Sequence, residues 1–129
     1  MSVPEVAAYR ASVTGLRALF AFGLTQEFFG EDRSRIPAIM DALKSSFTDL
    51  EQRFGVRVLG TLDDDETMVG AAETWPWTCY VLAEVPDRAA AANVCNLLRE
   101  TEVGDARLWK YLKIEARLGR PLFFAEPAG

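Results

Sequence analysis

Apolar residues form four short runs with the two-residue period of β-strands. Residues 16–25 are apolar on both alternating faces, which is typical of a strand in the centre of a sheet. Residues 56–62 and 77–84 alternate more clearly, and Pro76 precedes the second of these runs, where its missing N–H breaks no ladder hydrogen bond. Residues 108–118 form the last predicted strand.

Two further segments have the three- and four-residue spacing of amphipathic helices. The first has Asp32 or Ser34 as a cap and Pro37 in its first turn, and its apolar stripe continues to Phe54, before Gly55 in a C-cap position. The second begins with Asp87 as N-cap and ends before Gly104. Both helices are expected to bury one side.

The order strand, helix, strand, strand, helix, strand predicts an α+β fold of the ferredoxin-like βαββαβ type. Its four-stranded antiparallel sheet has the first and third strands in the centre and both helices on one face. We expect this domain to span residues 15–124. Residues 1–14 are expected to form an N-terminal arm or short helix, and residues 125–129 a C-terminal tail.

The second face of the sheet is left without a helical cover. In the last predicted strand, this face receives the side chains that alternate with Leu112 and Ile114. Such a face exposes more apolar surface than monomers usually show. We therefore expect a homodimer that pairs the two sheet faces, with a cavity between them. The side chains placed there are Trp109, Tyr111, Lys113, Glu115 and Arg117.

Composition narrows the choice of partners. The 129-residue chain has a formal net charge of -5 and no basic run, which argues against nucleic acid and anionic membranes, since phosphate binding needs clustered Lys and Arg. No apolar stretch approaches the roughly 20 residues that span a bilayer. The N-terminus shows no secretory signal, so we expect a cytoplasmic protein.

The chain contains no histidine. This excludes Ser-His and Cys-His nucleophiles, conventional His-rich metal sites and His-ligated haem. Cys79 and Cys95 fall in apolar runs and are expected to be buried thiols. The acidic run 63–66 is expected to form a solvated turn, and no glycine pattern suits a nucleotide, so we expect neither a metal nor a cofactor.

Aromatic and charged residues of the open side provide the candidate site. The aromatic side chains would form the walls of a pocket for a planar ligand, or alternatively the anchors of the dimer interface. Lys113 and Arg117 could bind a ligand carboxylate, whereas Glu115 and Tyr111 are the candidate catalytic groups for proton transfer. The alternative for the charged residues is an ion-paired rim. The aromatic candidates for ligand binding are Trp75, Trp77, Tyr80 and Trp109.

Three runs, VRVLGTLDDDETMVG, WPWTCYVLAEV and VGDARLWKYLKIEARLGRPL, resemble the small accessory proteins of bacterial indole-3-acetate degradation clusters. The resemblance covers residues 18–122 and implies a role in aromatic catabolism. The fold resembles the dimeric α/β barrels, which include cofactor-independent monooxygenases and lactone isomerases. Such families often use a histidine in the cavity, which this chain lacks.

Two functions stay open at this point. In the first, the protein is an enzyme or accessory factor that holds an indole-3-acetate-like acid between the sheets, stacked on Trp77 and Trp109. The carboxylate of that acid would lie near Lys113 or Arg117. In the second, the protein is a non-catalytic dimeric binding or assembly protein with the aromatics as interface core.

Overall fold

The computed structural model describes residues 16–66, 69–70 and 75–122. The predicted arm, residues 1–14, and the predicted tail, residues 125–129, lie outside the described residues. Within the described part of the chain, no helix has the length and hydrophobicity needed to span a bilayer.

Four strands form one antiparallel sheet. β1 (Leu16–Leu24) and β3 (Cys79–Val85) lie in the centre, and β2 (Arg57–Asp63) and β6 (Leu112–Gly119) form the edges. The strand order β2-β3-β1-β6 places the first and third strands of the predicted pattern in the centre. The ferredoxin-like α+β fold is therefore confirmed.

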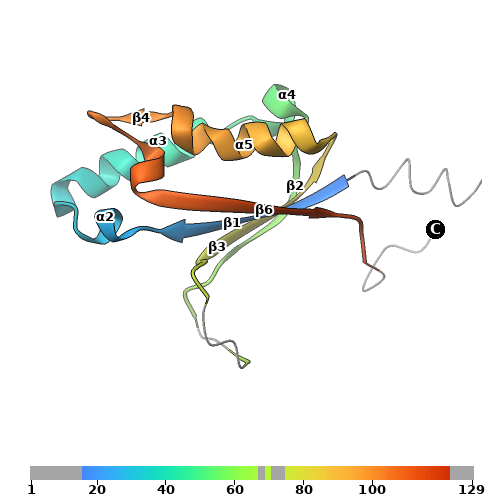
Figure 1. Cartoon of the computed structure of the whole chain (residues 1–129), viewed down its shortest axis with the longest axis horizontal. Helices are drawn as coiled ribbons and strands as arrows, with labels where there is room; N and C mark the ends of the chain where they lie inside the picture. The colour runs from blue at the N-terminus through green and yellow to red at the C-terminus, as the bar shows by residue number, and fades with distance from the viewer. Residues whose placement is uncertain (1–15, 67–68, 71–74, 123–129) are drawn as a thin grey trace, which may run out of the picture.

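Helices cover one face of this sheet. α3 (Ile36–Ser46), α4 (Leu50–Phe54) and α5 (Arg88–Glu100) lie on the same side of the strands (Figure 1). The short helix α2 (Gln26–Phe29) and a 3-10 turn, η1 (Arg33–Arg35), connect β1 to α3. The two longer helices, α3 and α5, thus pack on the same face of the sheet, as their apolar stripes predict.

The strand pleat decides which side chains lie under the helices. Ala18, Phe20 and Phe22 on β1 are buried there with Val94 of α5. Burying a phenylalanine side chain stabilises the fold by about 1.5–3 kcal/mol. The residues that alternate with them, among them Leu19, point to the other face of the sheet.

The helix ends follow the predicted caps. The Asp87 carboxylate accepts a hydrogen bond from Ala90 N at 2.8 Å at the start of α5. Asp32 accepts one from Ser34 N at 3.0 Å ahead of η1. Gly55 ends α4 with a φ of 72°, a left-handed conformation that favours glycine.

The predicted uninterrupted helix up to Phe54 is wrong, because the chain breaks between α3 and α4. Hydroxyl groups bond to helix carbonyls at the break: Ser46 Oγ donates to Leu43 O at 3.0 Å, and Thr48 Oγ1 donates to Ser45 O at 2.8 Å. Such bonds compete with the helical backbone pattern. Asp49 then adopts a left-handed φ of 52° before α4 begins.

The last strand also starts later than predicted, at Leu112 instead of Leu108. A small hairpin, β4 (Glu102–Val103) and β5 (Ala106–Arg107), is followed by a 3-10 turn, η2 (Leu108–Lys110). Leu108 is fully buried and its N–H donates to Thr101 O at 2.9 Å. A 3-10 turn has three residues per turn, so the two-residue alternation of the strand does not extend back through it.

Leu108→Ala tests this anchor of η2. We expect a loss of about 2–5 kcal/mol in the free energy of unfolding, measured by urea denaturation, because the truncation leaves a cavity. Leu59→Ala is the matched control, because Leu59 is 38% exposed. Equal losses in the two variants would contradict the assignment of Leu108 to the core.

Candidate functional site

We call the side of the sheet away from α3 and α5 the open face. Strand register assigns side chains to it, because directly paired residues of neighbouring strands share a side. Leu19, for example, pairs with Leu82 on one flank and Arg117 on the other. The open-face residues of the four strands are Arg17, Leu19, Ala21, Gly23, Arg57, Gly60, Leu62, Tyr80, Leu82, Glu84, Lys113, Glu115, Arg117 and Gly119.

The open face is more basic than the chain as a whole. Among the described residues that the register assigns to it, four are basic, whereas only Glu84 and Glu115 are acidic. The whole chain has a net charge of -5. The face therefore favours an anionic ligand. Its basic residues are Arg17, Arg57, Lys113 and Arg117.

One end of the open face holds a pocket of about 380 Å³, which we call the arginine pocket. It lies where β1 begins and β6 ends, so it unites residues that are far apart in sequence. Among the described residues, none that lines it is aromatic. Its basic lining residues are Arg17, Arg117 and Arg120, and its apolar walls include Leu19, Leu82 and Leu122.

Arg117 is ion-paired within its own strand. Its Nε donates to Glu115 Oε2 at 3.0 Å, and the Arg117 side chain is 76% exposed. This contact uses one of the five N–H donors of the guanidinium group. Glu115, the predicted catalytic carboxylate, is thus brought next to Arg117 on the open face.

The opposite end of the open face carries Trp75, Trp77 and Tyr80, which we call the aromatic end. Trp75 Nε1 donates a hydrogen bond to Tyr80 Oη, and the two rings lie 6.3 Å apart. Tyr80 Oη also donates to Trp77 O at 3.3 Å. Lys113 Nζ lies 5.7 Å from the centre of the Trp77 ring. Four of the predicted ligand-binding residues are therefore neighbours.

Gly23 allows the chain to cross the end of β1 at this place. A Cβ atom at Gly23 would lie 2.5 Å from Pro76 O and 2.8 Å from Lys113 Cε. Thr78 N donates to Phe22 O at 2.7 Å and holds the crossing segment in place. The sequence contains this signal as a glycine within an otherwise apolar central strand, which often marks a close approach of other groups.

Trp109 and Tyr111 lie on the helix side, so their predicted location on the open face is wrong. Arg99 of α5 lies over the Trp109 ring, 5.1 Å from its centre, and Trp109 is 55% exposed. Tyr111 is only 3% exposed and packs with Ile39 and Leu108. The cause is η2, which replaces the predicted strand alternation before Leu112.

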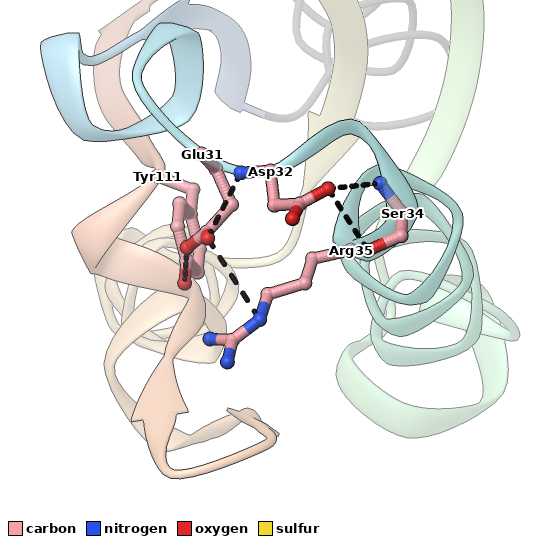
Figure 2. A network of polar contacts seen from close by, with 5 residues as sticks. All are labelled: Glu31, Asp32, Ser34, Arg35 and Tyr111. Atoms are coloured by element: carbon pink, nitrogen blue, oxygen red, sulfur yellow. Dashed lines mark hydrogen bonds and ion pairs between the residues drawn. The ribbon is translucent and has the colours of Figure 1, made fainter.

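Tyr111 takes part in a polar network beside α3 (Figure 2). Its hydroxyl donates to Glu31 Oε2 at 2.7 Å, and Glu31 Oε1 lies 3.8 Å from Arg35 Nε. The hydroxyl bond holds the pKa of Glu31 below its usual 4.5, and the Glu31 carboxylate raises the pKa of Tyr111 above 10.0. Tyr111 is thus a protonated donor at neutral pH, on the opposite side of the sheet from Glu115.

The two cysteines are half-buried, as small apolar side chains of the core. Desolvation raises the pKa of both the Cys79 and the Cys95 thiols. Within the described part of the chain, neither belongs to a group of three possible metal ligands. Both groups therefore favour the unreactive thiol form at neutral pH.

Comparison with known proteins supports the fold. No family model and no curated protein matches the chain. The crystal structure of methylated RPA0582 protein aligns with 98% of this chain and 96% of its own, at 17% identity and a TM-score of 0.50. A second structure of RPA0582, a Rhodopseudomonas palustris protein of unknown function, aligns with the same coverage at 19% identity and a TM-score of 0.47.

A putative chlorite dismutase, TA0507, is also similar. It aligns with 88% of this chain at 20% identity and a TM-score of 0.47. This chain spans 46% of the length of that protein. The likeness to methylated RPA0582, at 17% identity, concerns the fold alone.

Tyr111→Phe tests the role of the Glu31 network. Because the folded-state pKa of Glu31 lies below 4.5, the hydroxyl bond stabilises the folded protein above that pH, and its contribution is lost as the pH falls further. The difference in unfolding free energy between wild type and variant should therefore be largest at neutral pH and shrink in acid, in urea denaturation at a series of pH values.

Tyr80→Phe is the matched control for this experiment. The Tyr80 hydroxyl contacts Trp75 and the Trp77 carbonyl, neither of which titrates. Its effect on stability should not change across the acid range. A Tyr111→Phe effect that is equally independent of pH would contradict the proposed coupling to Glu31.

Proposed function

We propose that this protein binds a small apolar carboxylic acid on the open face of a homodimer, with planar aromatic acids such as indole-3-acetate as the class to test. The observation that carries this proposal is the arginine pocket, which combines three arginine residues with leucine walls in an acidic protein. A guanidinium group matches a carboxylate with two parallel hydrogen bonds. The pocket volume of about 380 Å³ is within the range of small-molecule sites.

The apolar surface of the open face supports the homodimer. Leu19 and Leu82 are neighbours in the centre of that face and each is 38% exposed, although central strands of a sheet are usually covered. Leu62 and Trp75 add side chains that are 60% and 59% exposed. Pairing two open faces, as in the dimeric α/β barrels, would remove this surface from water.

The ion pair between Arg117 and Glu115 supports a second candidate function. It pairs the charges of Glu115 and Arg117 without a ligand, as an ion-paired rim would. In that case the protein is a non-catalytic dimeric binding or assembly protein, and the aromatic end is part of the interface core. Saturable binding of an acid on the open face is expected for the first function and not for the second.

Calorimetric titration with indole-3-acetate tests the ligand class. We expect saturable binding, and a loss of affinity of about tenfold or more in Arg117→Ala, because a charge-assisted hydrogen bond is removed. Arg88→Ala, at the start of α5, is the control and should bind as wild type does. Indole-3-acetamide, which lacks the carboxylate, should bind weakly.

Two results of this titration would contradict the proposal. An absence of binding heat with indole-3-acetate up to millimolar concentration would contradict binding of this acid class. Equal binding of the acid and the amide would contradict the role of the arginines.

Sedimentation equilibrium tests the homodimer. We expect twice the chain mass of 14.3 kDa at micromolar concentration. Leu82→Glu should shift the protein to monomer, because it places a carboxylate in the centre of the buried face. Ala92→Glu, on the exposed side of α5, should leave the dimer intact. A wild-type monomer would refute the pairing of open faces.

A further inference from the structure

The two ends of the open face are chemically unlike. The arginine pocket lies where β6 ends, and the aromatic end lies where β6 begins, beside Lys113. Lys113 and Arg117 are four residues apart on one strand, which corresponds to roughly 13 Å. The guanidinium groups and the stacking surface of one copy are therefore separated along the face.

The symmetry of a face-to-face dimer determines which ends meet. In an aligned packing of two sheets, a two-fold axis that runs along the strands places each arginine pocket on the arginine pocket of the partner. An axis that runs across the strands instead places each arginine pocket on the aromatic end of the partner. The first arrangement opposes the three arginines of one copy to those of the other, whereas the second brings them to aromatic rings, which attract them, and to one cation, Lys113.

We propose that the ligand site is composite: the arginine pocket of one copy is completed by the aromatic end of the other. This inference rests on the proposed function and specifies how the acid is recognised. The acid carboxylate binds Arg117 and Arg120 of one copy, and its planar ring lies between Leu19 of that copy and Trp75 of the partner subunit. Each dimer holds two such sites, related by the two-fold axis.

The composition of the pocket supports this arrangement. Its described lining supplies cations and leucines but no aromatic ring, so within the described part of the chain the stacking surface lies at the other end of the face. Trp75 is 59% exposed within its own chain, although its indole N–H is bonded to Tyr80. An exposed ring that is held in position by a hydrogen bond is suited to stack on a ligand or a partner.

Complementation between two variants tests the composite site. Arg117→Ala and Trp75→Ala chains, each with a different affinity tag, are co-expressed and the heterodimer is purified through both tags. If the site is composite, one of the two sites in the heterodimer contains both substitutions, and the other contains neither. We expect each homodimeric variant to bind indole-3-acetate about tenfold more weakly, and about half the sites of the heterodimer to regain wild-type affinity.

A matched pair of variants provides the control. Arg88→Ala and Trp109→Ala remove an arginine and a similarly exposed tryptophan from the helix side. Their heterodimer should bind with wild-type affinity at every site.

The outcomes separate this inference from the proposed function. If the wild-type protein binds indole-3-acetate but no site of the heterodimer regains wild-type affinity, the composite site is overturned and the proposed function stays intact. Wild-type affinity in the Trp75→Ala homodimer would also overturn it. An absence of wild-type binding would overturn both.

Discussion

The packing of α3 and α5 on one face of the sheet is the interaction on which the rest of the structure depends. It buries Phe20 and Phe22 of β1 against α5 and its neighbours, and the strand pleat then directs Leu19 and Arg17 to the opposite side. The open face is a consequence of that one-sided burial. Because two helices cannot cover both sides of a four-stranded sheet, any function of the open face depends on what else covers it.

The charge distribution gives the open face its character. The acidic chain places an excess of basic residues on this side of the sheet, and three arginines converge where β1 begins and β6 ends. Two such faces repel each other if their basic ends coincide. An anionic ligand, or an arrangement that brings arginines to the aromatic end, relieves this repulsion.

Much of the fold could be predicted from the sequence because strand periodicity and helix caps are local signals. The apolar run of β1, the alternation in β3, the Asp87 cap and the Gly55 end are each carried by a few adjacent residues. The break between α3 and α4 was missed because apolar spacing continues across it, although the hydroxyl groups of Ser46 and Thr48 are a sequence signal for it.

The candidate site was predicted less completely, because it depends on contacts between distant segments. The η2 turn depends on the bond from Leu108 to Thr101 and on burial of Leu108 beside α5, which no local pattern shows. Trp109 and Tyr111 were therefore assigned to the wrong side. Arg17 and Arg120 were missed because only the register of β1 with β6 brings these two ends of the domain together.

The register also suggests how such a site can be found from sequence. Once β1 and the last strand are recognised as neighbours, basic residues at the start of one and at the end of the other become candidates for a shared site. Tyr111 carried a comparable signal, since a tyrosine buried next to apolar residues needs a partner for its hydroxyl, and Glu31 supplies it.

Oxidative footprinting of tryptophan side chains tests most directly whether the open face is covered in the assembled protein. In the single chain, Trp75 beside the open face and Trp109 on the helix side are 59% and 55% exposed, so they should react at similar rates if no partner covers either. Pairing of the open faces predicts that Trp75 is oxidised much more slowly than Trp109, and that Leu19 and Leu82 are protected with it. Equal oxidation of Trp75 and Trp109 would contradict that pairing.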